Sequence, residues 1–338
     1  MIRRTCVCLA IAVFASPQFA FAEGDWEITL ESEQALERGL EWLKRNQGTE
    51  GNWTSNDLGL VSLGGLAFLA DGHAPGRGPH GQTVSRALDY VMNQAKPSGL
   101  LNTSHQQRDM YNHGLATFVL AQIHGMTTTR DRRLHQVLDR ALKVIANTQC
   151  EDGGWDYRAR RQSRGHDLSL AVMQAKALRS AVDSGLEVRP EVIDLAIQSV
   201  REHYCPSRGR RNTPESEMRK MPGQFTYSKG GGKGTTAMAA AGVVCLQEFG
   251  QYDDWRIPKN MDFIVERIRQ LREPRRRDGT MPFDAYTLYY VGQALYQVGG
   301  EQWEDNYPIL RDYLVESQII NNNDLGHDGS WYDKGGSG

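Results

Sequence analysis

The stretch RGLEWLKRNQGTEGNW, residues 38–53, decides the fold because the chain repeats its landmarks. These landmarks are an amphipathic segment, a glutamine (Gln47), and then a glycine and a tryptophan (Gly51 and Trp53). A second copy, RALKVIANTQCEDGGW, occupies residues 140–155. Weaker copies keep the glycine at 99–101, 223–225, 279–281 and 329–331, the last of them preceded by Gln318. A period of roughly 50 residues is typical of helical arrays.

Two kinds of predicted helix alternate along the chain. The first is amphipathic with a charged face, as shown by Leu36, Leu40 and Leu43 at helical spacing. We expect it at 33–47, 83–95, 131–149, 190–204, 258–272 and 303–320. The second is rich in glycine and alanine, lacks a strong polar face and should therefore be surrounded by other helices. We expect it at 57–71, 110–125, 167–184, 235–249 and 284–298.

Charged helices outside and small-residue helices inside predict an all-α fold. We expect one α/α toroid domain over residues 23–338, with about six outer and five inner helices. The sequence stops at 335–338, where a sixth inner helix would begin, so that helix is predicted to be missing. The open seam would expose apolar flanks of the first and fifth inner helices. Patches of this kind mark either a protein-partner site or an aggregation-prone surface, and both alternatives stay open for this seam.

The first 22 residues have the features of a cleavable signal peptide. Arg3 and Arg4 precede an apolar stretch at 6–14, and Ala20-Phe21-Ala22 is a small-residue cleavage site. The apolar stretch is too short to span a membrane. We therefore expect a periplasmic or secreted protein. A formal net charge of −2 argues against nucleic acid as a partner.

The mature chain would keep three cysteines, which argues against a disulfide framework. Cys150 and Cys205 both follow outer helices, and whether they pair stays open. Neither a Cys-x-x-Cys pair nor a spaced His/Asp/Glu cluster occurs, so no metal and no cofactor are predicted.

The residues Arg38-Gly39, Trp42-Leu43, Gln47, Gly51 and Trp53 match the QW motif of squalene and oxidosqualene cyclases. The mature chain resembles the prenyltransferase/squalene-oxidase repeat proteins, which share the α/α toroid with protein prenyltransferases. The resemblance implies a central cavity lined by aromatic side chains. However, the chain lacks the Asp-x-Asp-Asp acid motif of the cyclases and the Asp-x-Cys zinc motif of the prenyltransferases. The nearest string, at 252–255, follows an inner helix and so lies at the wrong end.

The motif also has a structural interpretation. A glutamine at the end of an outer helix can bond the carbonyls left unpaired there, and the glycine permits a tight turn. The tryptophan would cover the helix end with a large apolar face. We therefore predict structural rather than catalytic roles for Trp53 and Trp155.

In a toroid, the loops from outer to inner helices meet at one mouth, where the N-termini of the inner helices favour anions. Basic loops at this position indicate a mouth for an anionic ligand, although a solvated charged surface is the alternative. Aromatic rings there would contact a ligand or pack between helices. The predicted ligand-binding residues are Tyr157, Arg161, Arg164, Phe225, Tyr227, Lys233 and Tyr286.

Asp167 and Asp284 each begin an inner helix. Two carboxylates at one cavity could serve acid–base chemistry, but aspartate is also a preferred N-cap residue. His166 and His113 are candidate general bases, with a structural role as the alternative.

We therefore expect an exported toroid, similar to terpenoid cyclases and prenyltransferases, that binds an isoprenoid-like or amphiphilic anionic small molecule. Whether the toroid converts this ligand stays open. The first alternative is a non-catalytic interaction scaffold. The second is a glycan-active lyase or hydrolase, which rests on fold analogy.

Overall fold

The computed structural model describes residues 26–126, 131–208, 213–232, 234–271, 279–321, 323 and 326–332. The predicted signal peptide and Lys233 therefore lie outside the described residues. Within the described ranges, no helix is both long enough and apolar enough to cross a membrane.

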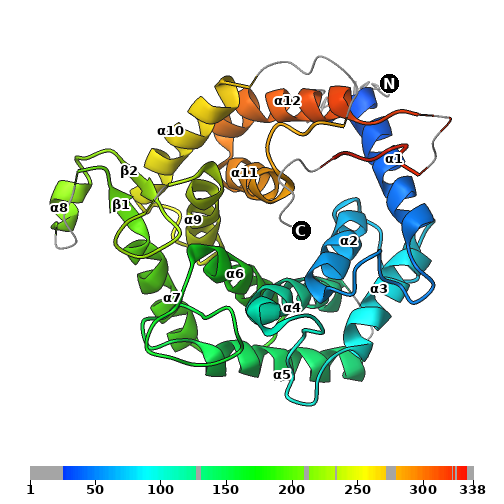
Figure 1. Cartoon of the computed structure of the whole chain (residues 1–338), viewed down its shortest axis with the longest axis horizontal. Coiled ribbons are helices and arrows are strands. Elements are labelled where there is room, and N and C mark those ends of the chain that lie inside the picture. The colour runs from blue at the N-terminus through cyan, green and yellow to red at the C-terminus, as the bar shows by residue number, and fades with distance from the viewer. Residues whose placement is uncertain are drawn as a thin grey trace, which may run out of the picture.

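The helices form two concentric rings, as Figure 1 shows, and the predicted α/α toroid is confirmed. The outer ring contains α1 (Leu30–Asn46), α3 (Gly81–Asn93), α5 (Arg132–Thr148), α7 (Pro190–Glu202), α10 (Arg256–Arg269) and α12 (Gly300–Ser317). The inner ring contains α2 (Leu58–Ala70), α4 (Asp109–Met126), α6 (Leu168–Asp183), α9 (Thr236–Glu248) and α11 (Ala285–Val298). Consecutive inner helices pack on one another in this order.

Small residues let the inner helices pack closely. Every residue from Ala237 to Gln247 of α9 is buried. A Cβ atom on Gly242 would lie 2.1 Å from the ring of Phe225, so only glycine fits there. An outer helix such as α5 buries only one stripe, which includes Leu134, Leu138 and Ile145. Burial on all sides therefore distinguishes α9 from an outer helix such as α5, as the composition predicts, whereas α11 beside the open seam is buried on one side only.

The motif glutamines connect three of the outer helices to the outer helix that follows, namely α1 to α3, α5 to α7 and α12 to α1. The Nε2 of Gln47 donates to the carbonyls of Gly51 (3.0 Å) and of Thr83 in α3 (2.9 Å). Gln149 does the same with Gly153 (3.0 Å) and with Val192 in α7 (2.9 Å). We call this arrangement the outer clamp. The glutamine thus bonds the following outer helix, and not the last carbonyls of its own helix as the sequence predicts.

The tryptophan bonds the helix end instead. Trp53 Nε1 donates to the Leu43 carbonyl (2.7 Å), and Trp155 Nε1 donates to the Ile145 carbonyl (2.9 Å). Trp155 is only 1% exposed. Tryptophan therefore satisfies a carbonyl that the helix leaves unpaired while it buries its ring, as the predicted structural role requires.

The motif glycines permit the close approach of the next helix. Gly153 has a φ of 79°, and a Cβ there would lie 2.0 Å from the Leu195 carbonyl oxygen of α7. A side chain at this position would be excluded by the backbone conformation and by the neighbouring helix.

A third outer clamp closes the ring between the last and the first outer helix. Gln318 Nε2 donates to the Ala35 carbonyl of α1 (2.8 Å) and to the Gly329 carbonyl (3.0 Å). Arg38 Nε in turn donates to Gln318 Oε1 (2.9 Å). The sequence repeat and the spatial ring therefore coincide, since the last copy of the motif clamps the first helix.

The inner ring stays open between α11 and α2 in the described part of the chain (Figure 1). Leu60 of α2 and Tyr296 of α11 are exposed, at 48% and 71%. A partner at this seam stays a prediction.

The loop from α7 to α9 carries elements that the sequence does not predict. Strands β1 (Tyr204–Pro206) and β2 (Gly223–Phe225) pair antiparallel, and α8 (Glu215–Met218) lies on the arm between them, which projects from the ring in Figure 1. A short 3-10 helix, η1 (Gln106–Arg108), precedes α4. Cys150, Cys205 and Cys245 are free thiols, so the open question about Cys150 and Cys205 is answered against a disulfide.

Gln318→Ala should lower the free energy of unfolding by about 2–4 kcal/mol, because two carbonyls and Arg38 lose a buried partner. Urea denaturation followed by circular dichroism measures the change. Gln270→Ala is the matched control, since Gln270 also follows an outer helix but is exposed. Its effect should stay below about 0.5 kcal/mol. Equal losses in both variants would contradict a closing role for the outer clamp.

Candidate functional site

The outer-to-inner loops bring the starts of all five described inner helices to one face of the ring, which we call the mouth. Four of these helices begin at an aspartate, and α9 is capped by Thr235. The positive ends of four helix dipoles are therefore already occupied by carboxylates. This weakens the basis for an anionic ligand deep in the mouth. The four aspartates are Asp57, Asp109, Asp167 and Asp284.

Asp109 and Asp284 have structural partners. Asp109 is buried, and it accepts hydrogen bonds from Asn102 Nδ2 (2.7 Å) and from the backbone N–H of Ala159 (3.1 Å). Asp284 accepts from the backbone N–H of Thr287 (2.9 Å) and from the Thr287 hydroxyl (2.6 Å). The N-cap alternative therefore describes Asp284.

Asp167 occupies the N-cap position of α6, but its side chain does not cap the helix. Instead, its Oδ2 accepts a short hydrogen bond from the Tyr157 hydroxyl. Burial is the largest cause that raises the pKa of Tyr157, and the hydrogen bond to Asp167 raises it further. Tyr157 therefore stays protonated at neutral pH and acts as a donor. The Asp167 carboxylate is thus free of any helix-capping duty.

Three more tyrosines surround this pair. The Tyr111 ring lies 5.8 Å from the Tyr157 ring, and its hydroxyl bonds the Ser169 hydroxyl. Burial raises the pKa of Tyr111 to about 12. Burial also raises the pKa of Tyr227, and the carboxylates of Asp167 and Asp284 add to that shift.

The fourth tyrosine, Tyr286 at the start of α11, has a buried hydroxyl without a hydrogen-bond partner. Burial raises its pKa, with further contributions from Tyr111 and Tyr227. The mouth therefore combines protonated phenols with the Asp167 carboxylate.

The loop between α5 and α6 holds Tyr157 and Asp167 in place. The Met110 N–H donates to the Tyr157 carbonyl (3.0 Å), which fixes the loop to the start of α4. Asp152 Oδ1 accepts from the backbone N–H of Gly154 (3.1 Å) and of Gly165 (2.9 Å), so it joins the two ends of the loop. Lys229 Nζ bonds Asp152 Oδ2 at 2.8 Å and thereby attaches the α7–α9 loop.

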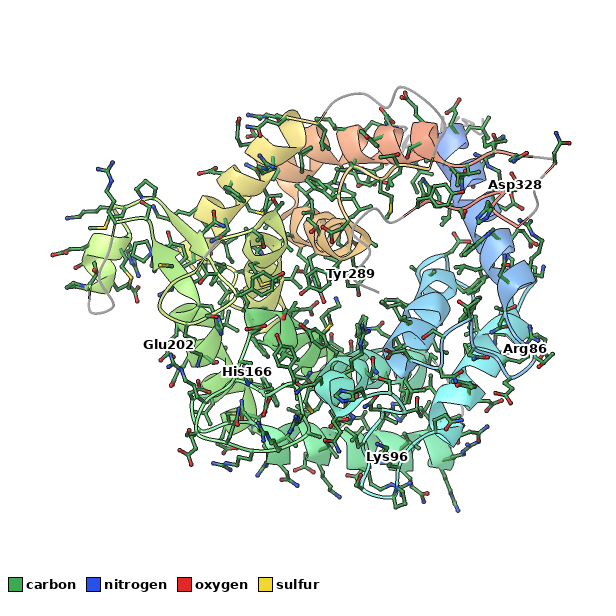
Figure 2. The ribbon with its side chains drawn as sticks, viewed as in Figure 1. Arg86, Lys96, His166, Glu202, Tyr289 and Asp328 are labelled. Carbon is green, nitrogen blue, oxygen red and sulfur yellow. The ribbon has the colours of Figure 1, made fainter. Side chains whose placement is uncertain are left out.

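His166 lies on this loop and is exposed (Figure 2). Its ring lies 5.1 Å from that of Tyr157, and its Nε2 lies 3.4 Å from Asp156 Oδ1. Arg161 and Arg164 are exposed on the same loop. The structure thus brings Tyr157, Tyr227, Tyr286, His166 and Asp167 to one mouth, with both arginines at its rim.

Two predicted residues lie elsewhere. His113 is fully buried: its Nδ1 accepts from the Leu101 N–H (3.0 Å), and its Nε2 lies 3.0 Å from the Ala141 carbonyl. Both ring nitrogens contact the backbone, which favours the structural alternative for His113 over the general-base alternative. Phe225 is fully buried against Gly242 and takes the place that tryptophan has in the complete motif. Its assignment as a binding residue stays a prediction that this burial does not support.

Sequence reasoning missed Tyr111, Ser169 and the buried Asp109. The available signal was their position, since each lies in the first turn of an inner helix, next to the predicted Asp167. Among the described residues, no three His, Cys, Asp or Glu side chains form a group that could hold a metal ion.

Deeper along the inner ring, Lys176 of α6 pairs with Glu248 of α9 (3.1 Å) and bonds Gln293 of α11 (2.8 Å). Its ammonium lies 4.6 Å from the centre of the Phe118 ring. Figure 2 shows Tyr289 on the side of α11 that faces the middle of the ring. The inner helices therefore carry polar as well as aromatic side chains in this part of the inner ring.

No protein-family model and no curated protein matches the sequence. Among solved structures, the fold is similar to an inactive variant of an alpha-1,6-mannanase of Salegentibacter sp. HEL1_6 in complex with alpha-1,6-mannotetrose. The TM-score is 0.55 at 11% identity, over 89% of this chain and 92% of that chain. A type II terpene cyclase of Scytonema in complex with geranylgeranyl dihydroxybenzoate matches at a TM-score of 0.34 and 13% identity, over 85% of this chain and 97% of that chain. The first similarity supports the α/α toroid fold.

Asp284→Ala should lower the free energy of unfolding by about 1 kcal/mol, because α11 loses its N-cap. Asp167→Asn should change it by less than about 0.5 kcal/mol, since Asp167 caps nothing and asparagine keeps an acceptor for Tyr157. Thermal and urea unfolding of both variants measure the difference. A larger loss from Asp167→Asn than from Asp284→Ala would show that Asp167 is a structural residue.

Two buried histidines, His113 and His203, should make the fold less stable as the pH falls from 6.5 toward 4, a range that lies mostly above the pKa values of carboxylates. Burial lowers the pKa of His113 and of His203 from 6.5 to about 4, with Lys229 adding to the shift of His203. Between these values the unfolded chain binds more protons than the folded one, so stability is full above pH 6.5 and is lost as the pH falls toward 4. The loss should be at most about 3 kcal/mol for each histidine. Urea denaturation at several pH values measures it, and His113→Gln should reduce the slope. An unchanged slope in this variant would contradict the assignment, and the exposed His105→Gln serves as the control.

Proposed function

We propose that the mouth binds a hydroxyl-rich ligand of the glycan class and that Asp167 exchanges protons with it. The observation that carries this proposal is the difference between Asp167 and the capping Asp284. Asp167 holds an N-cap position without capping, and its carboxylate meets the hydroxyl of a partly buried tyrosine instead. A charged group freed from its structural duty at the mouth of a fold is a functional candidate.

The chemistry of the mouth matches sugar hydroxyls better than an anion. The raised pKa values keep Tyr111, Tyr157, Tyr227 and Tyr286 protonated, so their rings offer apolar faces and their hydroxyl oxygens can accept from ligand hydroxyls. The Tyr157 proton is used by Asp167, whereas the Tyr286 hydroxyl has no partner. The Asp167 carboxylate is an acceptor for ligand hydroxyls. The exposed Arg161 and Arg164 would bind acidic substituents of the glycan at the rim, and not its centre.

Asp167 is placed to act as the base. Its carboxylate would accept the proton of a ligand hydroxyl or of an attacking water on a lone pair that Tyr157 does not use, while the Tyr157 hydroxyl donates to Oδ2 and holds the carboxylate in position. Asp284 is the second carboxylate near Tyr227 that could take part in glycoside chemistry, although it also caps α11. The predicted export of the chain would give such a mouth access to glycans outside the cytoplasm.

An amphiphilic isoprenoid-like ligand is the second candidate. It is favoured by a row of rings on α11, in which Tyr286 and Tyr290 are 4.9 Å apart and Tyr290 and Tyr289 are 5.0 Å apart. Such a row could lead an apolar chain from the mouth along the inner wall. The polar contacts of Lys176 in that wall, with Glu248 and Gln293, count against a dry cavity.

Binding to an array of neutral and acidic glycans, followed by calorimetry with the best ligand, tests the proposal. Tyr157→Phe should weaken the affinity by about tenfold, because the Asp167 carboxylate loses the hydroxyl that holds it in position for the ligand. Tyr296→Phe is the control, since Tyr296 is exposed away from these contacts. If the glycan is converted, Asp167→Asn should abolish turnover in a folded protein. Binding of geranylgeranyl diphosphate without any glycan would favour the second candidate, and binding of neither would favour a scaffold.

A further inference from the structure

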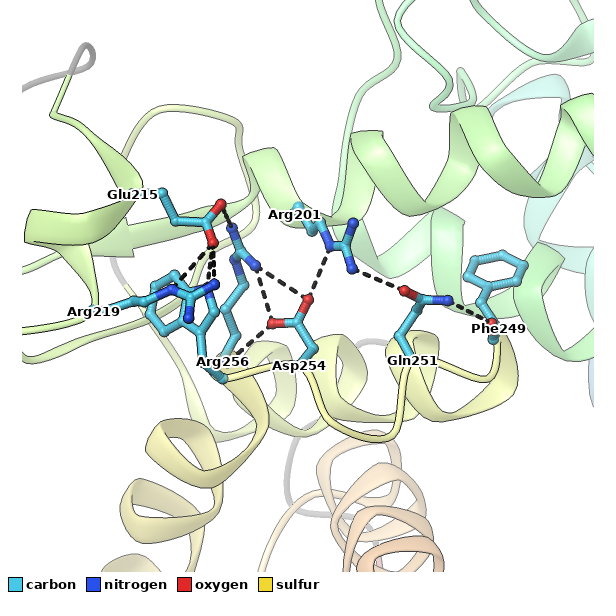
Figure 3. Close-up of polar contacts among 8 residues, drawn as sticks. Arg201, Glu215, Arg219, Phe249, Gln251, Asp254 and Arg256 are labelled. Carbon is cyan, nitrogen blue, oxygen red and sulfur yellow. Dashed lines mark hydrogen bonds and ion pairs between the residues drawn. The ribbon is translucent and has the colours of Figure 1, made fainter.

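A cavity of about 470 Å³ lies outside the mouth, between α7, α8 and the turn from α9 to α10. That turn follows the C-terminal end of an inner helix, whereas the mouth lies at the N-terminal ends. Figure 3 shows the polar contacts at the cavity. Three guanidinium groups from three elements line it, namely those of Arg201, Arg219 and Arg256.

Arg256 is the buried centre of this site. It is 5% exposed, and its Nη1 bonds both carboxylate oxygens of Asp254, at 3.0 and 3.1 Å. Its guanidinium lies 4.4 Å from the centre of the Trp255 ring. Its Nε is buried without any hydrogen-bond partner. A buried donor without a partner costs free energy unless a ligand or water satisfies it.

Asp254 is a structural counter-ion. It is buried at the start of the chain segment that leads into α10, and Arg201 Nε donates to it at 2.9 Å. Arg201 also donates to Gln251 Oε1 (2.8 Å). Because its carboxylate is held by two arginines on the protein side, Asp254 would not leave the site when a ligand enters.

Glu215 is a different kind of counter-ion. It begins α8, a helix of four residues on the projecting arm, and its side chain is 48% exposed. Its carboxylate accepts hydrogen bonds from Trp255 Nε1 (2.9 Å) and from Arg219 Nη2 (2.7 Å), and it lies 3.4 Å from Arg256 Nη2. One half-exposed carboxylate on a short helix therefore pairs with three residues of the cavity, namely Arg219, Trp255 and Arg256.

We propose that this cavity is a binding site for a small carboxylic acid, whose carboxylate replaces that of Glu215 on Arg219, Arg256 and the Trp255 N–H. Planar guanidinium groups bind carboxylates through paired hydrogen bonds, and the cavity volume lies in the range of small-molecule sites. The exposed ring of Tyr252 and the ring of Trp255 supply apolar walls for the rest of the ligand. Glu215 then acts as a built-in competitor that lowers the affinity and links ligand binding to the position of the α8 arm.

Calorimetry with succinate as the probe tests this site. Glu215→Gln should bind succinate at least about tenfold more tightly than the natural protein, because the competing carboxylate is gone. Asp253→Asn is the matched control: it removes one negative charge from the same cavity but leaves the contacts of Glu215 in place. The affinity of Asp253→Asn for succinate should differ from that of the natural protein by less than about threefold. Adding Arg219→Gln to Glu215→Gln should remove the gain, since Arg219 is exposed and its loss should not unfold the protein.

Equal gains in Glu215→Gln and Asp253→Asn would overturn the proposal, because they would reflect net charge alone. The proposal would also be overturned if folded Glu215→Gln did not bind succinate. The same holds if the protein bound a glutamate-rich peptide but did not bind succinate. The mouth and this cavity share no residue, so the result does not depend on the glycan proposal.

Discussion

Each motif glutamine holds two outer helices together by donating from one amide group to two carbonyls, and the rest of the molecule depends on this bond. In the outer clamps of Gln47, Gln149 and Gln318, one carbonyl belongs to the motif glycine and the other to the following outer helix. The amide is largely or fully buried at Gln149 and Gln318, where an unpaired carbonyl would be costly. Because the outer helices follow one another in the same orientation, the inner helices between them all begin on the same face.

This shared orientation creates the mouth. Five helix starts meet there, and four of them carry an aspartate. Three aspartates are engaged by backbone, asparagine, arginine or threonine donors, which complement the positive helix ends. Asp167 alone among them is held by a tyrosine hydroxyl. The same geometry that stabilises the ring therefore leaves one carboxylate among phenols, and this contrast is what the proposed glycan chemistry uses.

The two-ring fold was predictable because it depends on local patterns. Helical spacing at Leu36, Leu40 and Leu43 and the small residues near Gly242 report burial on one side or on all sides, and both patterns are readable in one dimension. The weaker motif copy at 223–225 places Phe225 at the tryptophan position, and the contact with Gly242 shows how its ring fills that place. The full burial of Phe225 and the partners of His113 at Leu101 and Ala141 were not predictable, because tertiary packing sets them.

The two aspartates Asp167 and Asp284 show most clearly what the sequence alone cannot predict. Asp167 and Asp284 occupy equivalent positions at the starts of inner helices, and the sequence offers capping and catalysis for both. The difference arises from Tyr157, which lies ten residues before Asp167 in a loop fixed by Asp152 and by the start of α4. Side-chain competition of this kind depends on the folded loop, which no residue pattern reports.

We propose that ligands enter the mouth at the starts of the inner helices. Hydrogen–deuterium exchange, with and without a bound glycan, measures this most directly. A glycan in the mouth should slow exchange in residues 109–113, 153–169 and 284–288. Slower exchange confined to the opposite face, at residues 71–80, 184–189 and 249–255, would contradict it.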